Sequence, residues 1–190
     1  MELILASQSP RRKQLLEEQG YKADVHPAEI AETISTTMPL DEALERLALD
    51  KARAVQPAFP DRTILAADTV VVYGGEILGK PSDDREACDY LMRLSGETHQ
   101  VKTGVCILTP ELEITFTDTT DVHFRVLEDQ EILEYTDSGR ALDKAGAYGI
   151  QDSGFVDRIS GSWSNVVGLP MEKVEEVLDY LCRKGCPTAV

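Results

Sequence analysis

The sequence predicts a mixed α/β protein, in which one sheet holds both parallel and antiparallel strands and packs against helices. Apolar side chains recur at helical spacing in some segments, and β-branched residues gather in others, so both element types are expected. Two long β-rich runs, around 100–108 and 114–126, follow each other without an intervening helix. Strands and helices therefore alternate only in part, which favours a mixed sheet over a doubly wound parallel one.

The amino-terminal part predicts a strand followed by two helices. The apolar run 3–6 indicates a short buried strand. A helix is expected directly after it, with Ser9 as its N-cap and Pro10 at its first position. Residues 39–56 predict a second helix, because their apolar side chains share one helical face: Leu40, Ala43, Leu44, Leu47 and Ala48.

The rest of the chain predicts a hairpin, further strands and three more helices. The β-branched run 63–73 passes through a Gly-Gly pair into 76–78, which is typical of an antiparallel hairpin. Ser82 is expected to cap a third helix that reaches about Leu94. Beyond the two long β-runs we expect a short acidic helix near 129–135, strands within 155–167 interrupted at Gly161, and a final amphipathic helix over 170–181.

Length, composition and charge limit the protein classes. A chain of 190 residues forms a single domain spanning 1–190, or two small lobes that share one core. Apolar residues make up 42% and charged residues 28%, which is typical of a globular protein and argues against disorder. No apolar run approaches the ~20 residues of a membrane span, and the start lacks the basic region of a signal peptide, so a cytoplasmic protein without membrane contact is expected. The formal charge of -15 argues against nucleic-acid binding.

The four cysteines, Cys88, Cys106, Cys182 and Cys186, do not form the pattern of a disulfide framework. In a chain without an export signal, thiols are expected to stay reduced. Cys182 and Cys186 lie close in the sequence, but without a second pair and with only scattered histidines they do not predict zinc. We interpret all four as ordinary structural thiols.

A basic cluster at the start of the first helix is a candidate anion site. The segment from Ser7 to Lys13 joins the first strand to this helix, and helix amino termini attract anions through unpaired N–H groups. Ser7 and Ser9 add hydroxyl donors, and Arg11 and Arg12 can bind phosphate oxygens in a bidentate manner. We favour a phosphate site over the alternative, a capped helix whose arginines are solvated.

Asp68 is the most unusual single residue. It lies in the apolar run 64–72, where strand alternation places it on the same face as Ile64 and Ala66. An unpaired buried carboxylate is costly, so Asp68 is expected to be paired, bound to a metal or placed at the opening of a cleft. A functional role is favoured, and a structural ion pair is the alternative.

Lys80 ends a near match to the phosphate-binding P-loop pattern. Pro81 replaces the residue that must supply a hydroxyl, and the run looks like a hairpin, so we reject a P-loop. Lys80 can still reach a phosphate, because its segment returns toward the end of the strand that carries Asp68.

Three further residues give weaker signals. Glu32, in a polar stretch, would by itself indicate an exposed acid, and Lys51 would indicate an ion pair within its helix. In the segment 142–151 two glycines permit close backbone approach, and Gln151 can read donor and acceptor groups on a base edge. A tight structural turn explains this segment nearly as well.

Taken in order, these segments resemble the Maf family of nucleoside triphosphate pyrophosphatases. Each stretch alone is weak, but their order and spacing along nearly the whole chain make the resemblance specific. The stretches are Ser7-Gln8-Ser9-Pro10-Arg11-Arg12, Glu32, Lys51-Ala52-Arg53, Ala67-Asp68-Thr69, Gly79-Lys80-Pro81, Leu94-Ser95-Gly96, 144–151 and Val167-Gly168-Leu169-Pro170.

The resemblance implies a mixed sheet with helices on both sides and two lobes around a deep nucleotide-binding cleft. It also implies hydrolysis of a nucleoside triphosphate to the monophosphate and pyrophosphate, with a divalent metal cation, Mg²⁺ or Mn²⁺, as cofactor. Members are often dimeric, so a homodimer is one expectation. The Asp-Thr and Lys-Pro pairs, with a glutamine after Gly149-Ile150, are similar to the branch that acts on dTTP and UTP.

The resemblance also implies roles for single residues. In this branch the residue that matches Asp68 is the proton acceptor, and those that match Arg11, Thr69 and Gln151 determine substrate choice. From the chemistry of the reaction, Asp68 either accepts a proton from the attacking water or, with Glu32, holds the metal. The phosphate tail is assigned to hydroxyl and basic side chains: Ser7, Ser9, Arg11, Arg12, Lys51 and Lys80.

Two alternatives to this function stay open. The first is a nucleotide-binding regulatory protein that senses without turnover, although such a protein has no need for Asp68 beside a polyphosphate. The second is a pyrophosphatase for purine or noncanonical triphosphates such as inosine triphosphate, which keeps the enzyme and changes the base.

Overall fold

The computed structural model describes residues 2–184, so the thiol of Cys186 lies outside the described residues. Within that range the strands are β1 (Glu2–Leu5), β2 (Lys22–Val25), β3 (Ile64–Tyr73), β4 (Glu76–Leu78), β5 (Thr98–Leu108), β6 (Glu113–Phe124) and β7 (Val156–Ser160). The helices are α1 (Pro10–Glu18), α2 (Leu40–Val55), α3 (Asp84–Leu94), α4 (Asp129–Asp137), α5 (Trp163–Val167) and α6 (Met171–Lys184), with 3₁₀ turns at Gln56–Ala58 and Ala145–Ala147. None of the described helices is both long and apolar enough to cross a membrane.

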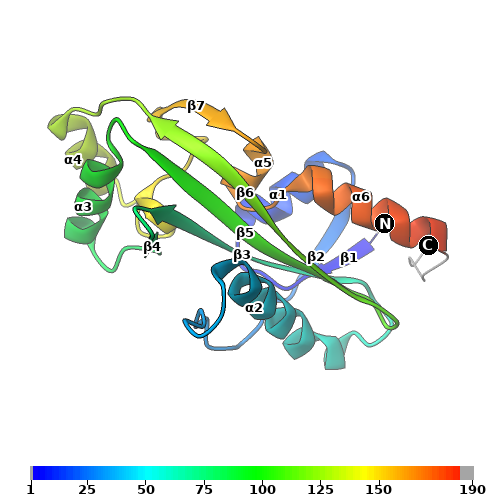
Figure 1. Cartoon of the computed structure of the whole chain (residues 1–190). Coiled ribbons are helices and arrows are strands. Elements are labelled where there is room, and N and C mark those ends of the chain that lie inside the picture. Colours follow the sequence, from blue (N-terminus) through cyan, green and yellow to red (C-terminus); the bar gives the residue numbers. More distant parts are fainter. Residues whose placement is uncertain (1, 185–190) are drawn as a thin grey trace. The chain divides into compact units, whose positions relative to one another are not determined.

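The strands within residues 2–184 form one seven-stranded sheet in the order β2-β1-β3-β5-β6-β7, with β4 paired to β3 off this path (Figure 1). Strand β1 runs parallel to both β2 and β3. Strands β3 and β4 are antiparallel, as are β6 and β7. The predicted mixed sheet is therefore confirmed.

The chain divides into two compact units. Within the described residues, unit 1 comprises 2–68, 103–118 and 168–184, and unit 2 comprises 69–102 and 119–167. Strands β3, β5 and β6 each contribute residues to both units. Asp68 is the last residue of its stretch in unit 1, and its neighbour Thr69 begins unit 2.

In unit 1, helix α2 packs on one face of the strands. Its inner side chains form a buried cluster with Ile64 and Ala66 of β3, which alternation places on the same face. The close approach of α2 requires Gly104 of β5, because an added Cβ there would lie 2.5 Å from the backbone carbon of Leu44. The other buried members of this cluster are Ile4, Ala6, Ala48, Ala52, Val55, Cys106 and Leu108.

Helices α1 and α6 lie on the opposite side of the unit 1 strands from α2 (Figure 1). Their buried apolar side chains are Leu15, Leu16, Met171, Val174, Leu178 and Leu181. The strand residues that alternate away from α2 are buried as well, namely Leu3, Leu5, Leu65 and Ala67. Both faces of β1 and β3 are covered, which explains why these strands are continuous apolar runs in the sequence. The predicted helices on both sides are thus confirmed in unit 1.

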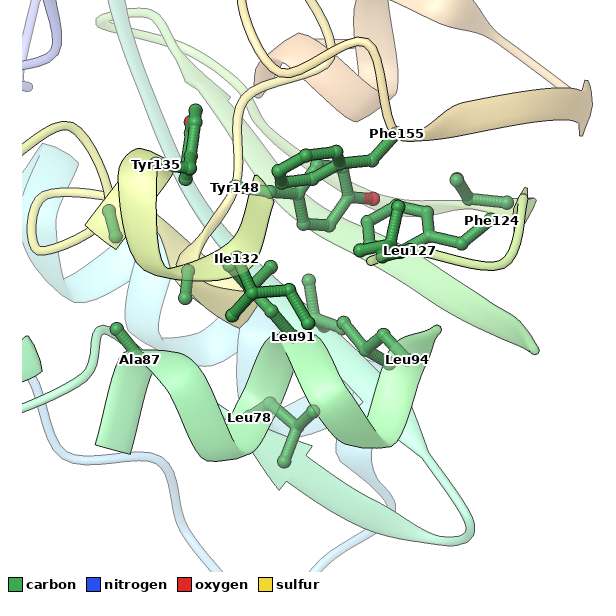
Figure 2. Close-up of a cluster of buried hydrophobic side chains, with 14 of the residues drawn as sticks. Leu78, Ala87, Leu91, Leu94, Phe124, Leu127, Ile132, Tyr135, Tyr148 and Phe155 are labelled. Carbon is green, nitrogen blue, oxygen red and sulfur yellow. The ribbon is translucent and has the colours of Figure 1, made fainter. Parts of the chain in front are cut away.

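Unit 2 has its own core, in which α3 and α4 pack together. Leu91 and Leu94 of α3 join Ile132 of α4 and several aromatic side chains (Figure 2). The ring of Phe124 is edge-on to Tyr148, with ring centroids 4.6 Å apart, and tilted against Phe155 at 5.8 Å. Aromatic rings prefer such edge-to-face contacts because their faces are negative and their edges positive.

The hairpin predicted after β3 is present. Val71 of β3 pairs with Leu78 of β4, and Val72 pairs with Ile77. Both turn residues, Gly74 and Gly75, have positive φ, at 59° and 83°. A two-residue hairpin turn of type I′ requires this backbone conformation, which glycine adopts without strain.

The N-cap of α3 differs from the prediction. The cap is Asp83, whose side chain accepts a hydrogen bond from the N–H of Glu86 at 2.8 Å. Ser82 instead donates both its N–H and its hydroxyl to the carboxylate of Glu86. The cap is displaced by one residue because the N–H of Glu86 donates to Asp83, while the carboxylate of Glu86 accepts both hydrogen bonds from Ser82.

The segment after Gly161 is the short helix α5, so the strand predicted there is wrong. The hydroxyl of Ser162 accepts a hydrogen bond from the N–H of Asn165 at 3.1 Å, which holds the first turn of the helix. The side-chain amide of Asn165 donates to the carbonyl of Val101 in β5. This tertiary hydrogen bond compensates for the weak helix preference of a β-branched segment.

Candidate functional site

The turn from β1 into α1 is organised by a buried arginine. Arg12 is 9% exposed and donates from Nε to the carbonyl of Gly168 (2.8 Å) and from Nη1 to Oγ of Ser7 (2.9 Å). Oγ of Ser7 also accepts from the N–H of Ser9 at 3.2 Å. Ser9 holds the N-cap position as predicted, but its hydroxyl makes no capping bond with the described residues. The alternative of solvated arginines is wrong for Arg12.

Lys51 brings two carboxylates together. Its side chain is only 5% exposed, and Nζ lies 2.6 Å from Oδ1 of Asp68 and 2.8 Å from Oε1 of Glu32. The three residues come from α2, from β3 and from the segment between β2 and α2. The expectation that Lys51 pairs within its own helix is therefore wrong, because both partners are distant in the sequence.

Asp68 lies on the face of β3 that α2 covers, as its alternation with Ile64 and Ala66 predicted. Its side chain is 16% exposed, and the expected partner is present in Lys51. An ion pair of these two residues alone would fit a structural role. Glu32, whose side chain is 54% exposed, extends this group of charged side chains to the solvent.

The carboxylates of Asp68 and Glu32 also affect the pKa of Arg12. Burial lowers the pKa of the Arg12 guanidinium, Asp68 and Glu32 oppose this decrease, and the positive charge of Arg11 adds to it. The fields of both carboxylates therefore reach Arg12. We refer to Arg12, Glu32, Lys51 and Asp68 as the charged cluster, in which two buried cations stand beside two carboxylates.

The carboxylates of the charged cluster fit a divalent metal that arrives with ligands of its own. Glu32 and Asp68 are hard oxygen donors, and Mg²⁺ in phosphate sites is usually held by one or two carboxylates together with phosphate oxygens and water. Both already contact the same cation, the ammonium of Lys51. Among residues 2–184, no group of three or more His, Cys, Asp or Glu side chains is placed to hold a metal. The donor set therefore fits joint binding of metal and phosphate rather than a closed protein cage.

Unit 2 contains the other predicted residues. Lys80 is exposed, and the carbonyl of Gly79 beside it accepts a hydrogen bond from the N–H of Gly146 at 3.0 Å. The segment that carries Gln151 is thereby tied to the segment that carries Lys80. Gln151 is exposed in a turn, and Thr69 is half-buried. The structure thus brings together the Lys80 and Gln151 segments in unit 2. In unit 1 it brings together Ser7, Arg12, Glu32, Lys51 and Asp68. Arg11, also in unit 1, is half-buried on α1.

Both glycines of the 142–151 segment lie close to side chains of the protein itself, as the alternative of a tight structural turn expects. An added Cβ on Gly146, whose φ is +66°, would lie 2.7 Å from Cγ2 of Val71. On Gly149 it would lie 2.8 Å from both Oδ1 of Asp152 and Cε of Lys144. A larger residue at Gly146 would be strained by the positive φ and would collide with Val71, whereas one at Gly149 would require the side chains of Asp152 and Lys144 to move.

Three residues that hold this turn were not predicted. The hydroxyl of Tyr135 donates to Oδ1 of Asp152 at 2.9 Å and accepts from the N–H of Gly149 at 3.1 Å. Lys144, which is 8% exposed, lies 2.8 Å from Oδ1 of Asp143 and 3.9 Å from Oδ2 of Asp152. A tyrosine on the inner face of a helix gives the sequence signal of a core residue, so nothing local distinguishes Tyr135.

The described cysteines are free thiols: Cys88 is half-buried, Cys106 buried and Cys182 exposed. Burial raises the pKa of Cys106 to about 12. A thiol with such a pKa holds little thiolate at neutral pH and is a poor nucleophile. Cys106 therefore contributes packing against α2 rather than chemistry.

Comparison with known proteins finds relatives along almost the whole chain. The family model described as Maf-like protein matches residues 2–181. A protein of Bacillus pumilus is 44% identical over 180 residues, which cover 94% of this chain and 95% of that protein. Proteins of a Geobacillus species and of Halalkalibacterium halodurans are each 47% identical, over 93% of this chain and 96% and 94% of their own lengths. All three carry the name dTTP/UTP pyrophosphatase.

Solved structures show a similar fold. A HAM1 protein from Coxiella burnetii matches with a TM-score of 0.56, and the Ham1 protein of Staphylococcus aureus with 0.53. Each is 15% identical, and each comparison covers 95% of this chain and 99% of the other. At this identity the likeness concerns the fold alone. Because one family model accounts for residues 2–181 and relatives are 44–47% identical over nearly their full lengths, the chain belongs to the Maf-like family.

Proposed function

We propose that the protein is a nucleoside triphosphate pyrophosphatase that converts dTTP and UTP to the monophosphate and pyrophosphate. The names of relatives that are 44–47% identical over 93–94% of the chain support the substrates. The structural observation that carries the chemistry is the Lys51 ammonium shared by Glu32 and Asp68, beside the buried Arg12. This cluster offers cations for phosphates and a carboxylate for the proton of water in one place.

The triphosphate needs local positive charge in a chain whose formal charge is -15. At an effective dielectric constant near 20, two unit charges 4 Å apart interact by about 4 kcal/mol, so a few nearby cations outweigh distant acids. The amino terminus of α1 adds N–H groups and hydroxyls that suit phosphate oxygens. We assign phosphate binding to Ser7, Ser9, Arg11, Arg12, Lys51 and Lys80.

In the proposed reaction, water attacks the α-phosphorus, the bond to the bridging oxygen breaks and pyrophosphate leaves. Asp68 accepts the proton that the attacking water loses. Lys51 donates to Oδ1 of Asp68, so we assign the proton to Oδ2. A positioned general base of this kind typically contributes about 10²- to 10⁴-fold to the rate. Charge stabilisation of the departing pyrophosphate by the basic side chains supplies the rest.

The proposal includes a divalent metal, Mg²⁺ or Mn²⁺, that Glu32 would hold and for which Asp68 is the second candidate ligand. When bound, it neutralises negative charge on the phosphates. Lys51 contacts the same two carboxylates, so without metal it is the cation that they share. A role of Asp68 as metal ligand is the alternative to its role as base.

Substrate choice is assigned to Arg11, Thr69 and Gln151. The amide of Gln151 offers both a donor and an acceptor, and Thr69 offers a hydroxyl, which suits the edge of a pyrimidine. A base with a mismatched edge would leave these groups unpaired and bind more weakly. We further propose that the protein acts in the cytoplasm, as a homodimer, on standard or modified pyrimidine nucleotides.

The test is pyrophosphate release from dTTP, UTP, CTP, dATP, GTP and inosine triphosphate, with and without Mg²⁺ or Mn²⁺. We expect metal-dependent release mainly from dTTP and UTP. Tight binding without release would indicate a nucleotide sensor. Release mainly from purines would keep the enzyme and overturn the substrate assignment.

The base-reading role is tested by Gln151→Ala. Because Gln151 is exposed, the substitution is expected to leave the free energy of unfolding nearly unchanged. We expect the ratio of kcat/KM for UTP over GTP to fall. A variant that discriminates as well as the parent would remove Gln151 from substrate choice.

A further inference from the structure

The hydroxyl of Tyr135 makes two of the contacts that attach the turn carrying Gln151 to the core of unit 2. Oη of Tyr135 donates to Oδ1 of Asp152 at 2.9 Å and accepts from the N–H of Gly149 at 3.1 Å. These two contacts bracket the dipeptide Ile150-Gln151. Inside the turn, the N–H of Asp152 donates to the carbonyl of Gly149 at 3.3 Å, so one short loop is closed by its own backbone and held by Tyr135.

We propose that Tyr135 is a positioning residue that fixes Gln151 for base selection, and that its hydroxyl, rather than its ring, performs this role. The inference rests on the proposed function of Gln151. Tyr135 does not itself contact the nucleotide in this proposal. It acts on substrate choice by restricting where the Gln151 amide lies.

The ring of Tyr135 is held independently of its hydroxyl. The side chain is 3% exposed, and the ring packs against Phe155, with centroids 5.0 Å apart (Figure 2). The guanidinium carbon of Arg140 lies over the same ring, 4.7 Å from its centroid. A phenylalanine at this position keeps these contacts, so Tyr135→Phe removes the two hydroxyl contacts to the turn without removing the packing.

Two further contacts of the turn also involve Asp152, one through its carboxylate and one through its backbone carbonyl. Nζ of Lys144 lies 3.9 Å from Oδ2 of Asp152, and Arg140 donates to the Asp152 carbonyl at 3.2 Å. An added Cβ on Gly149 would meet Asp152 and Lys144, so the backbone runs directly over them. Tyr135 and Lys144 therefore hold Asp152 from two sides, and Asp152 is the residue next to Gln151.

Loss of the Tyr135 hydroxyl is expected to act on recognition more than on the chemical step. A hydrogen bond of this kind corresponds to roughly three- to tenfold in an equilibrium constant. We therefore expect KM for dTTP and UTP to rise by about that factor, and discrimination against GTP to fall, while kcat changes by less than about twofold. A purely structural defect would instead lower the amount of active enzyme and leave KM and the selectivity unchanged.

The experiment compares the parent, Tyr135→Phe and Gln151→Ala in kcat and KM for UTP, dTTP and GTP. Tyr90→Phe is the matched control, because the Tyr90 hydroxyl donates to Glu86 within α3 and lies outside the turn. Hydrogen exchange of the Gly149 amide is measured in the same proteins. Tyr135→Phe is expected to speed that exchange and to change KM and selectivity in the direction of Gln151→Ala, whereas Tyr90→Phe does neither.

A pair of substitutions at Asp152 keeps the test valid if Tyr135→Phe folds poorly. Asp152→Asn retains an oxygen that can accept from Tyr135 and should stay within about twofold of the parent, whereas Asp152→Ala should resemble Tyr135→Phe. If Gln151→Ala loses selectivity but Tyr135→Phe and Asp152→Ala keep it, the positioning role is wrong and the proposed function stands. If the parent itself lacks pyrimidine selectivity, or Gln151→Ala retains it, the proposed role of Gln151 fails and the inference fails with it.

Discussion

Lys51 in unit 1 and His99 in unit 2 are both ionisable and almost fully buried, at 4% and 2% exposure, yet their surroundings are opposite. Lys51 meets two carboxylates at 2.6 and 2.8 Å. His99 meets the rings of Phe124 and Tyr148, and its Nε2 lies 2.8 Å from the Tyr148 hydroxyl. Its Nδ1 is buried without a hydrogen-bond partner among the described residues.

The two residues differ in whether the fold provides a charged partner for a buried ionisable side chain. Burial lowers the pKa of His99 to about 4, because no carboxylate compensates for the lost hydration of the imidazolium, and His123 adds a smaller decrease. In the charged cluster, Asp68 and Glu32 provide that compensation for Lys51 and reach Arg12. A histidine in the core of unit 2 thus serves packing, whereas the buried cations of unit 1 lie beside carboxylates and suit the proposed phosphate-binding role.

The largest effect is expected from Asp68→Asn, which removes the proposed base and keeps the shape of the side chain. We expect kcat to fall by about 10²- to 10⁴-fold, while nucleotide binding persists because Lys51 and Arg12 stay in place. Turnover is followed by pyrophosphate release, and binding by calorimetry with a non-hydrolysable dTTP analogue. Near-normal turnover would remove Asp68 from the chemistry.

The second effect concerns His99 and pH. Its folded pKa, about 4, lies below the ordinary 6.5, so between these values the unfolded chain binds the additional proton and the native state loses stability as the pH falls. From pH 6.5 to 4 this loss amounts to roughly 3 kcal/mol, and the pH dependence from His99 fades within about one pH unit above 6.5. Urea unfolding from pH 4 to 7.5 measures it in the parent and in His99→Gln, which can still bond to Tyr148. The same acid sensitivity in both proteins would contradict the assignment to His99.

An intermediate effect is expected from Gly104→Ala, which disturbs the charged cluster without changing a charge. The new Cβ would lie 2.5 Å from the backbone of Leu44, so α2 must move away from the sheet and carry Lys51 with it. Overpacking of this kind costs about 1–3 kcal/mol of stability. Gly79→Ala is the control for urea unfolding, because nothing lies within 4 Å of its added Cβ. Equal stability of the two variants would show that α2 tolerates the displacement.

The smallest effect is expected from Glu32→Gln. The Glu32 side chain is 54% exposed, and ion pairs at exposed sites contribute less than about 1 kcal/mol to stability. If Glu32 also holds the metal, the Mg²⁺ concentration for half-maximal turnover should rise even though the free energy of unfolding hardly changes. A large loss of stability would instead make Glu32 a structural partner of Lys51.

The elements with strong local signals were predictable, and one strand without such a signal was not. The helical stripe of α2 and the Gly-Gly turn after β3 follow from neighbouring residues alone. Strand β2 was missed because Lys22–Val25 is mostly exposed at the edge of the sheet and shows no apolar alternation. Its pairing with β1 comes from backbone hydrogen bonds that any sequence can make.

The mixed sheet, the face of β3 that carries Asp68 and the family resemblance all follow from local sequence patterns and motifs. Three features became visible only once the chain was folded: Lys51 pairs with Glu32 and Asp68, Arg12 is buried against Gly168, and Tyr135 contacts the turn of Gln151. The difference lies in the sequence distance between the residues that determine each feature. Helical and strand periodicity depend on residues a few positions apart, whereas a buried ion pair depends on which helix packs on which strand.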